Sequence, residues 1–565
     1  MSLNGALAVA ARSLETFSLG IQVAGHNISN ASSPGYVRET LYTETLAPYS
    51  QGGVMIGGGV IATGVRQSID SYLESRIYGA NTDFSAASLR STAFQQLQTA
   101  LQELGDQDLS TSLNKLVAAV NATANQPDDP ALRSAVIQQG QQFVTDVQKL
   151  RGRLDQIRSA FSDQMSSLVS EANSLLGTVN DLNVKITQLE ANGLNRNDAG
   201  GLRVQRLNAL NRLSEIIPIR VQEFPSGAVD VHTGSDYLLL AGHQQQLQAV
   251  LAPTDDGVAE VNVQLSSTRA TLAASGGELG GLIQARDTIM TGFIDQLDRF
   301  VGAVVQQFNQ IHSSGEGLVG LTDVTATNFV NSTTADLNAA RLPFSVQNGH
   351  FELKVRNTQT GEVIVTDVPI DLDGAGGDMS LEDLRTALNN IDHVNASITN
   401  EGKLRITTDS GYEVRFAHDT SGVLAALGVN TFFTGSTSGN IDVNVRVVQD
   451  QRLFASGQGG GPADNSNILA LAQFIDKPVS QLNGISIDRF YTQLVGNTAQ
   501  SAAAEEALST GYLNFRDSLK TQREQTSGVS LDDEAIRIMN LQHNYQAAAR
   551  IVSTIDQLLN VLLQM

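Results

Sequence analysis

At its C-terminus the sequence reads LDDEAIRIMNLQHNYQAAARIVSTIDQLLNVLLQM, from Leu531 to Met565, with apolar residues alternately three and four positions apart. Side chains at this spacing share one face of a helix, and a repeat of 3.5 residues is typical of a helix that winds around a partner. The C-terminal seam comprises Ile538, Leu541, Tyr545, Ala548, Val552, Ile555, Leu559 and Leu562. Ser530 is a candidate N-cap, and the acidic residues after it favour a helix start. The pattern predicts a coiled-coil helix, although a buried stripe in a globular core shows similar spacing.

The first residues of the chain have the same spacing. The N-terminal seam comprises Leu3, Leu7, Ala10, Leu14, Phe17, Ile21, Ala24 and Ile28. Each helical residue adds about 1.5 Å, so both ends would form rods of roughly 40 to 50 Å. Two matching seams favour pairing of the chain ends, with the rest of the sequence as an excursion between them.

Composition restricts the class of protein. The chain has 565 residues, no cysteine and a formal net charge of -22. The length predicts several domains, and the missing thiols are compatible with export. The acidic balance, without clusters of Lys and Arg, argues against nucleic acid as a partner. No apolar run reaches about 18 residues, so membrane insertion is not expected. The start, MSLNGALAVAARS, lacks a basic leader, so a cleaved signal peptide is not expected either.

Turn and strand signals divide the sequence between the two terminal helices into further segments. Breakers at 29–36 end the first helix, and a glycine-rich run at 52–59 predicts a flexible, extended connector. Helical spacing follows from about Ser71, is broken at Pro127 and Pro130, and then continues as one very long helix. Short strands are predicted within 217–240, and alternating strands within 321–450, where a helix from Leu381 to Asn389 is capped by Ser380.

These signals predict a multidomain α+β protein with paired terminal coiled-coil helices, a long helical bundle and an inserted, mainly β outer domain. The expected parts are an N-terminal axial helix and connector (1–58), a helical rod domain (59–200), a small β excursion (201–280), a second helical rod segment (281–320), the mainly β outer domain (321–450), a returning helical rod segment (451–528) and a C-terminal axial helix (529–565).

Motifs for catalysis and for cofactor or metal binding are not found. The eight histidines form no pair four residues apart, and the sequence has neither a Gly-x-Ser-x-Gly elbow nor a Walker loop. Asp371, Asp373, Gly376 and Glu382 match positions of a calcium loop, but Ala375 cannot ligate and a strand precedes them. We therefore expect an acidic turn before a capped helix. An enzyme domain within 321–450, displayed on an axial scaffold, is the alternative of a different class.

The turn after the first helix carries a recognisable motif. Asn27, Asn30, Pro34, Gly35, Tyr36 and Arg38 resemble the N-terminal motif of the flagellar rod, hook and hook-associated proteins. The segment 542–550 is similar to the C-terminus of the same group. Phe308, Asn309, His312 and Gly315, with the Gly-Gly-Glu-Leu-Gly-Gly run at 276–281, resemble the hook-filament junction branch. One departure is Ser32-Ser33, where relatives often carry threonine before proline.

The resemblance implies a structural axial protein that forms the junction between hook and filament by helical self-assembly through its terminal helices. It implies other copies of the chain, the hook protein and the second junction protein as partners, and an export chaperone on the C-terminal helix. It also implies an extracellular place in the bacterial flagellum, reached through the flagellar secretion apparatus. The hook protein, the second junction protein and flagellin are nearer alternatives for its identity.

Overall fold

The computed structural model describes residues 3–33, 35–51, 54–102, 108–190, 198–252, 260–272 and 276–564. Long helices alternate with small antiparallel sheets, which confirms the predicted multidomain α+β class. The chain forms two compact units, which are described separately below. The first contains Met1–Ala93, Ser159–Arg286 and Ala503–Met565, and the second contains Phe94–Arg158 and Asp287–Ala502. Within the described residues, no helix has the length and apolar character needed to cross a membrane.

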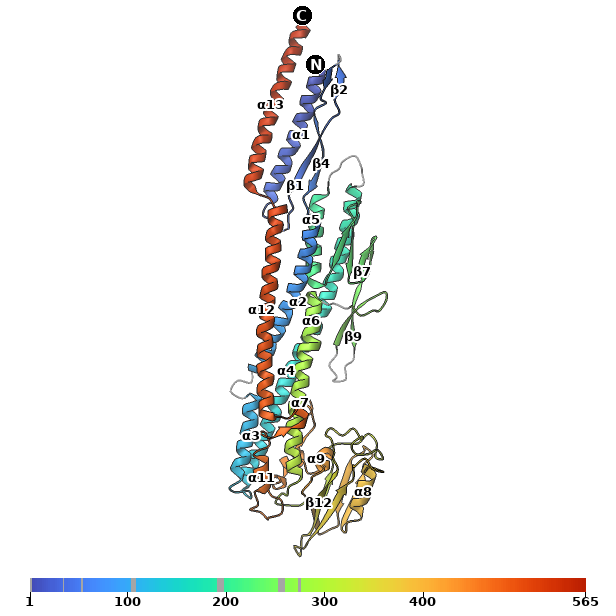
Figure 1. The fold of residues 1–565 in the computed structure, drawn as a ribbon, viewed down its shortest axis with the longest axis vertical. Coiled ribbons are helices and arrows are strands. Elements are labelled where there is room, and N and C mark those ends of the chain that lie inside the picture. Colours follow the sequence, from blue (N-terminus) through green and yellow to red (C-terminus); the bar gives the residue numbers. More distant parts are fainter. Residues whose placement is uncertain are drawn as a thin grey trace. The chain divides into compact units, whose positions relative to one another are not determined.

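The first unit is mainly helical (Figure 1). Its complete helices are α1 (Leu3–Asn30), α5 (Gly200–Ile216), α6 (Gly277–Gln284) and α13 (Leu531–Gln564). Three further helices contribute residues to both units: α2 (Ser71–Gln102), α4 (Pro130–Glu190) and α12 (Ile487–Ser527). A π-helix, η2 (Ala285–Met290), follows α6. The long α4 begins at Pro130, one of the two predicted breaks, because the missing amide of proline is not needed in the first turn of a helix.

Four small antiparallel sheets belong to the first unit. Three of them have two strands each: β1 (Glu39–Thr45) pairs with β4 (Val60–Gln67), β2 (Tyr49–Gln51) with β3 (Val54–Ile56), and β9 (Leu247–Ala252) with β10 (Glu260–Leu265). The fourth sheet has four strands in the order β5 (Arg220–Glu223), β6 (Val229–Thr233), β7 (Asp236–Leu240) and β8 (His243–Gln244). Within the predicted glycine-rich connector, residues 54–56 are therefore a paired strand, β3, and the paired strand β4 follows as the next element. The range 201–280, expected to be β, opens with helix α5, whose buried Leu207, Leu210 and Leu213 follow helical spacing.

The helical part of the second unit is centred on α7 (Thr291–Ser313). Shorter helices accompany it: α3 (Leu109–Thr123), α9 (Val423–Leu427), α10 (Val445–Gln449), η3 (Gln451–Leu453), α11 (Ser466–Leu471) and η4 (Ser480–Leu482). Two short hairpins join β17 (Phe433–Thr434) to β18 (Asp442–Val443) and β19 (Pro478–Val479) to β20 (Ile485–Ser486). Unlike most helices, α7 is buried along much of its circumference, as expected for a central helix.

A β domain is inserted after α7. Its sheets have the orders β13-β12-β16 and β11-β15-β14. The strands are β11 (Asp323–Thr325), β12 (Gly349–Asn357), β13 (Val363–Ile370), β14 (Val394–Ile398), β15 (Leu404–Thr408) and β16 (Tyr412–Ala417). Strand β12 buries Phe351, Leu353 and Val355 and turns the alternate residues outward. Helix α8 (Leu381–Asn389) has a capping box between Ser380 and Asp383, which confirms the predicted helix and its cap.

An aromatic cluster fills the core around α7. It comprises Phe143, Phe300, Phe308, Phe432, Phe433, Phe454 and Phe474. The ring of Phe308 lies at its centre, with centroids 4.9 Å from Phe432 and 5.4 Å from Phe474. His312, one turn further along α7, is fully buried; its Nδ1 lies 2.9 Å from the Asn430 carbonyl, and its Nε2 accepts the Ala455 amide at 3.0 Å. Burial lowers the pKa of His312 to about 4.

Candidate assembly site

Helices α1 and α13 lie side by side, so the structure brings the two predicted seams onto neighbouring helices (Figure 1). Ala548 and Ile555 of the C-terminal seam are buried, whereas Ile538, Leu541, Val552 and Leu559 are half-buried. The large residues of the N-terminal seam, Leu3, Leu7, Leu14, Phe17, Ile21 and Ile28, are also half-buried. Tyr545 remains 40% exposed, and the side chain of Leu562 lies outside the described residues. Each seam is therefore only partly covered within one chain.

A glycine of α1 lies directly against α13. The buried positions of α1 are Ala10, Thr16, Gly20, Ala24 and Asn27. A Cβ atom at Gly20 would lie 3.0 Å from Cδ1 of Leu541, closer than an ordinary van der Waals contact. The sequence-based seam therefore identifies the right pair of helices, while the close contact at Leu541 depends on Gly20, which is not a seam residue.

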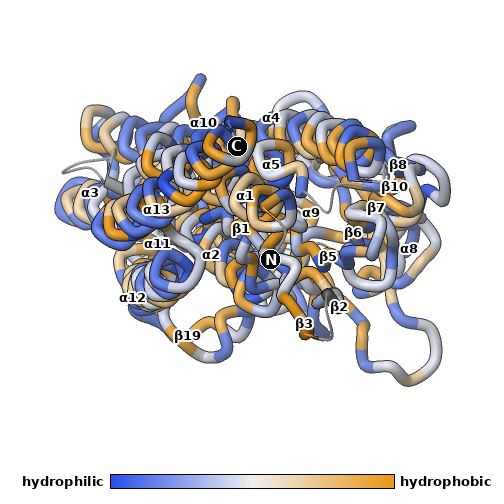
Figure 2. The backbone as a smooth tube through the Cα atoms, turned by 90° about the horizontal axis from the view of Figure 1, so that it is seen from above, coloured by the Kyte–Doolittle hydropathy of each residue, from blue (hydrophilic) through white to orange (hydrophobic). Residues whose placement is uncertain are grey.

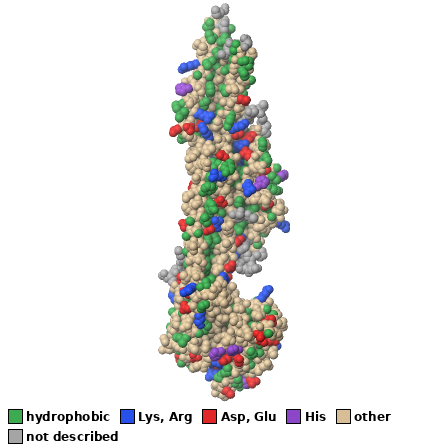
Figure 3. Space-filling model, in the orientation of Figure 1, with side chains coloured by type: hydrophobic (Ala, Val, Ile, Leu, Met, Phe, Trp, Pro, Cys, Tyr) green, Lys and Arg blue, Asp and Glu red, His purple; other side chains and the backbone are tan. Residues whose placement is uncertain are grey.

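Helix α13 has a second apolar face, which we call the outer face. It comprises Ile536, Met539, Ile551, Leu558 and Val561, all of them at least 50% exposed. At about 100° per residue these positions fall within one third of the helix circumference, centred about 140° around the helix from the C-terminal seam. Hydrophobic and hydrophilic positions alternate around the helix in Figure 2, and hydrophobic side chains reach the visible surface at this end in Figure 3. An exposed apolar face of this length marks an interaction surface.

Asn27 of the family motif connects the end of α1 to strand β1. Its side chain is fully buried. The amide Nδ2 donates to the carbonyl of Glu39, and Oδ1 accepts the backbone N–H of Glu39 and the Tyr36 hydroxyl, each at 2.9 Å. All three bonds satisfy polar groups that burial would otherwise leave unpaired. Asparagine at this position therefore sets how the chain turns from helix to strand.

The other motif residues support the same turn. Asn30 Nδ2 donates to the carbonyl of His26 in the last turn of α1. Gly35 has a φ of +72° and lies against Asn208, so a side chain would be both strained and obstructed there. Burial, together with the negative charges of Glu39 and Glu534, raises the pKa of Tyr36. Pro34 lies outside the described residues.

Arg38 joins this turn to the base of α13. Its Nε donates to Oε1 of Glu534 at 2.7 Å, and its backbone N–H donates to the Ser527 carbonyl at 2.9 Å. Glu534 is fully buried, and its Oε2 has no hydrogen-bond partner among the residues that the structure describes. Ser530 accepts the Asp533 amide at 3.3 Å, as the predicted N-cap would. The ion pair thus fixes where α13 begins relative to the motif.

Glu534 is the functional residue that sequence reasoning missed. In the sequence, Glu534 is one of three acidic residues after Ser530 that favour a helix start, together with Asp532 and Asp533. Glu534 lies four positions before Ile538, however, so it continues the seam spacing to a position that faces the partner helix. A charged residue in register with an apolar seam was therefore an available signal for a buried ion pair.

The calcium-loop pattern does not come together as one site. Asp371 and Asp373 have carboxylates near that of Asp378, whereas Glu382 lies in α8 and pairs with Arg385 at 2.8 Å. The cluster is largely exposed, and its oxygens accept backbone N–H groups of the same turn: Gly374 donates to Asp378 and Ala375 to Asp373. The arrangement agrees with the expected acidic turn that leads to a capped helix.

Two family models match the chain. The flagellar hook-associated protein FlgK helical domain matches residues 94–327. The flagellar basal body rod FlgEFG protein C-terminal model matches residues 521–565, which include all of α13. The first match includes Phe143, Phe300 and Phe308 of the aromatic cluster, and the second includes the whole C-terminal seam.

Full-length relatives agree with these matches. Flagellar hook-associated protein 1 of Escherichia coli (strain K12) is 23% identical, over 96% of each chain. The protein of that name from Salmonella typhimurium (strain LT2) is 24% identical over 96% of each chain, and that of Bacillus subtilis (strain 168) is 22% identical over 98% of this chain and 96% of its own. The solved flagellar hook junction protein FlgK from Burkholderia pseudomallei aligns with 81% of this chain and 100% of its own, with a TM-score of 0.50 and 16% identity, which shows a similar fold.

Proposed function

We propose that this chain, a relative of flagellar hook-associated protein 1 along nearly its whole length, is a structural subunit of the bacterial flagellum at the junction between hook and filament. It associates with other axial components of the flagellum, and its terminal helices are the parts that assemble. We assign it no enzymatic activity, in keeping with the missing catalytic and cofactor motifs. Residues 321–450 face outward as a structural domain.

The observation that carries this proposal is the pair of apolar faces on α13. The seam packs on α1 of the same chain, and the outer face has no cover among the described residues. A single chain can bury only one of the two faces, so the second is covered by neighbouring copies in a tube. The neighbours at either end of the junction are the hook protein and the second junction protein.

Before assembly, the outer face needs other protection. An export chaperone that binds Leu531–Gln564 would cover it while the chain awaits the flagellar secretion apparatus. The acidic net charge of -22 helps to keep the unassembled chain soluble. Passage through that apparatus would not require a cleaved signal peptide.

The substitution Leu558→Glu tests the role of the outer face. Leu558 is half exposed in the single chain, so a charge there should leave the monomer's melting temperature close to that of the parent. In the tube the same charge would be buried without a partner, so filaments should not form on hooks in a strain that lacks the parent gene. Filament number by electron microscopy and swimming motility measure the effect.

Asn560→Glu is the matched control, because it places the same charged side chain at an exposed position two residues further on, about 160° around the helix from Leu558 and outside both apolar faces. It should support filaments. If Leu558→Glu supports them equally well, the outer face is not an assembly contact. Immunogold labelling of intact flagella separates the remaining alternatives: labelling along the whole hook or filament, instead of at their boundary, would favour the hook protein or flagellin.

A further inference from the structure

The first unit has a hollow between α4 and the sheet β5–β8. We call it the groove; it is lined by residues of α4 between 180 and 188 and by residues of the sheet and its turns between 224 and 242. Its volume is about 590 Å³, and its walls are mostly apolar. Val184 and Phe224 of these walls are 51% and 39% exposed, so two large apolar side chains lie in water in the single chain. Such a groove is typical of a surface that receives a side chain or a ligand.

Two polar groups of the groove lack a partner. Asp230 is only 6% exposed; its Oδ1 accepts the Ala241 amide at 2.9 Å, but no cation pairs with it among the described residues. Asn180 Oδ1 is buried and accepts no hydrogen bond within the same part of the chain. A buried carboxylate is stabilised by a cation, and a buried acceptor by a donor. The groove therefore fits an apolar group with a positive charge beside it.

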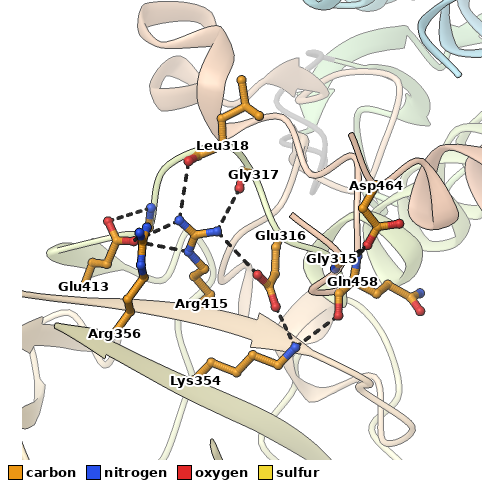
Figure 4. A network of polar contacts seen from close by, with 12 residues as sticks. Gly315, Glu316, Gly317, Leu318, Lys354, Arg356, Glu413, Arg415, Gln458 and Asp464 are labelled. Carbon is orange, nitrogen blue, oxygen red and sulfur yellow. Dashed lines mark hydrogen bonds and ion pairs between the residues drawn. The ribbon is translucent and has the colours of Figure 1, made fainter. Parts of the chain in front are cut away.

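By contrast, the charges that line a hollow of the second unit are paired within the chain. This hollow lies beside Glu316 and includes Lys354 and Arg415. Lys354 donates to Glu316 at 2.7 Å, and Arg415 donates to Glu413 at 2.9 Å (Figure 4). These charges therefore need no partner from outside, unlike Asp230 of the groove.

Helix α12 carries an exposed apolar stripe in its part of the first unit. The α12 stripe comprises Ala504, Leu508, Gly511 and Phe515, and this spacing of four, three and four positions places them on one face of the helix. Leu508 and Phe515 are 49% and 48% exposed, and a Cβ atom at Gly511 would meet no atom within 4 Å. Two large side chains thus project from open surface. Helices that occupy an apolar groove present anchors at such intervals.

A cation lies beside the α12 stripe. The Cζ atom of Arg76, an exposed residue of α2, lies 6.0 Å from the centre of the Phe515 ring. Arg76 pairs with no carboxylate among the described residues. The stripe therefore offers the apolar groups and the positive charge that fit the walls of the groove and Asp230.

The α12 stripe and the groove belong to opposite sides of one unit. Figure 1 shows α12 to the left of α2 and strand β7 to the right, and Figure 2 shows the same separation from above. A contact between two different surfaces of identical copies is heterologous, so it repeats around a ring or a helix. A contact between identical surfaces would stop at two copies. The positions of the two surfaces therefore suit a tube.

We propose that the α12 stripe of one copy docks in the groove of the next copy, with Leu508 and Phe515 against the apolar walls and Arg76 beside Asp230. Charge complementarity selects a second copy as the occupant, because the exposed cation matches the buried carboxylate. The proposal rests on the proposed function, since it needs copies that assemble side by side. It adds a contact of the helical body to those of the terminal helices.

Cross-linking in intact flagella tests this contact. The chain has no cysteine, so Val184→Cys in the groove and Leu508→Cys in the α12 stripe give one defined pair of thiols, which a short bismaleimide joins where they lie close together. Flagella built with the double variant should give dimers, trimers and longer ladders of this chain on a denaturing gel. Each single variant should remain monomeric, because a groove meets a stripe and not a second groove.

Glu506→Cys combined with Val184→Cys is the matched control, because Glu506 is an exposed residue of α12 about 160° around the helix from Leu508. It should give monomers only. Dimers from either single variant would mean a contact between identical surfaces, and a band that joins the groove thiol to a different flagellar protein would mean another occupant. Either result overturns the proposal, as does the absence of a ladder from the double variant in flagella.

Immunogold labelling of the same flagella separates this failure from that of the proposed function. A chain that labels the boundary between hook and filament but forms no ladder loses only the groove contact. A chain that is absent from the boundary loses the proposed function as well.

Phe515→Asp keeps the test valid if the cysteine pair builds no flagella. Phe515 is half exposed, so the monomer should melt close to the parent, whereas the new carboxylate would lie in the neighbour's groove near Asp230 and should reduce the number of filaments per cell. Thr510→Asp, at an exposed position about 140° around α12, is its control. Equal filament numbers for the two variants would overturn the proposal.

Discussion

The aromatic cluster is fully buried within one chain, whereas the α1–α13 pair is only partly buried. Around Phe308 every large side chain is buried by other parts of the same chain, and the polar groups of Asn309 and His312 bond to backbone atoms. Along α13, by contrast, one apolar face packs on α1 while the outer face remains in water. One chain can therefore complete its own core and still leave an apolar face exposed, and under the proposed function neighbouring copies cover that face.

The sequence shows why the two regions differ. Helix α7 presents apolar residues on most sides and is surrounded by segments from 430–474, so no face is left over. Helix α13 presents apolar residues on two faces, and of these the C-terminal seam packs on α1. Two kinds of substitution test this difference. One creates a cavity in the aromatic cluster, and the other places a charge on α13.

The largest effect is expected from Phe308→Ala. It removes ring contacts with Phe432, Phe433 and Phe474 and leaves a cavity, at a cost of about 3–5 kcal/mol in the free energy of unfolding. Urea unfolding followed by circular dichroism measures the change. Phe329→Ala, in the same unit but 61% exposed, is the control and should change stability by less than about 0.5 kcal/mol.

The second-largest effect is expected from acid, which should lower the free energy of unfolding through His312 beside the aromatic cluster. Burial is the main cause that lowers the pKa of His312 from 6.5 to about 4; the bond to Asn430 opposes this shift, and the nearby cation of Arg133 adds to it. Below about pH 6.5 the unfolded chain binds a proton that folded His312 does not, so stability is complete above that pH and falls until about pH 4. The total corresponds to about 3 kcal/mol.

Urea unfolding of the parent from pH 7 to pH 4 checks this loss. His312→Gln should be less stable at pH 7 but should show a flatter dependence on pH, whereas His243→Gln, at an exposed position in the first unit, should keep the parent's dependence. Equal slopes for the parent and His312→Gln would mean that another group causes the acid effect.

A smaller and more local effect is expected from Arg38→Gln. It leaves the carboxylate of Glu534 buried without its cation, which costs about 1–3 kcal/mol at the start of α13. Faster hydrogen exchange in the first turns of α13, with unchanged exchange in α7, is the expected readout. Arg550→Gln on the exposed side of α13 serves as the control. If both variants exchange alike, the ion pair does not hold the helix in place.

The smallest effect on the monomer is expected from Leu559→Glu. Leu559 is half-buried in the C-terminal seam, so a carboxylate there can still reach water, and the cost should be about 1–2 kcal/mol. Assembly should nevertheless be lost, because the tube would cover the remaining surface of the seam. Normal filaments with this variant would show that the seam at Leu559 is not part of the assembly contact.

Local signals predicted much of the fold. The terminal seams, the start of α4 at Pro130, and α8 with its cap Ser380 each depend on residues within one or two turns. Helix α5 was not expected, although its leucines have helical spacing, because Gly200 and Gly201 precede them and strand signals follow. Glycine at a helix start gives little local indication of a helix.

Such local signals do not predict contacts between residues that are far apart in the sequence. Arg38 and Glu534 are 496 positions apart; the seam spacing marks Glu534 as a position that faces the partner helix, but no periodic pattern identifies Arg38 as its cation. The aromatic cluster likewise joins Phe143, Phe308 and Phe454 from three separate segments. Family resemblance indicated Phe308 and His312, but only the three-dimensional arrangement shows that they form a core and are not a binding site.

The entry and exit of the β domain have a consequence for how such a protein can change over generations. Leu321 and Val414 exchange two backbone hydrogen bonds of 2.8 Å, and most of both sheets lies between them in the sequence. A segment whose two ends are neighbours can be inserted or deleted in a single genetic event, with a short turn closing the gap. The size of the β domain can therefore vary among descendants while α1 and α13 keep their length and register.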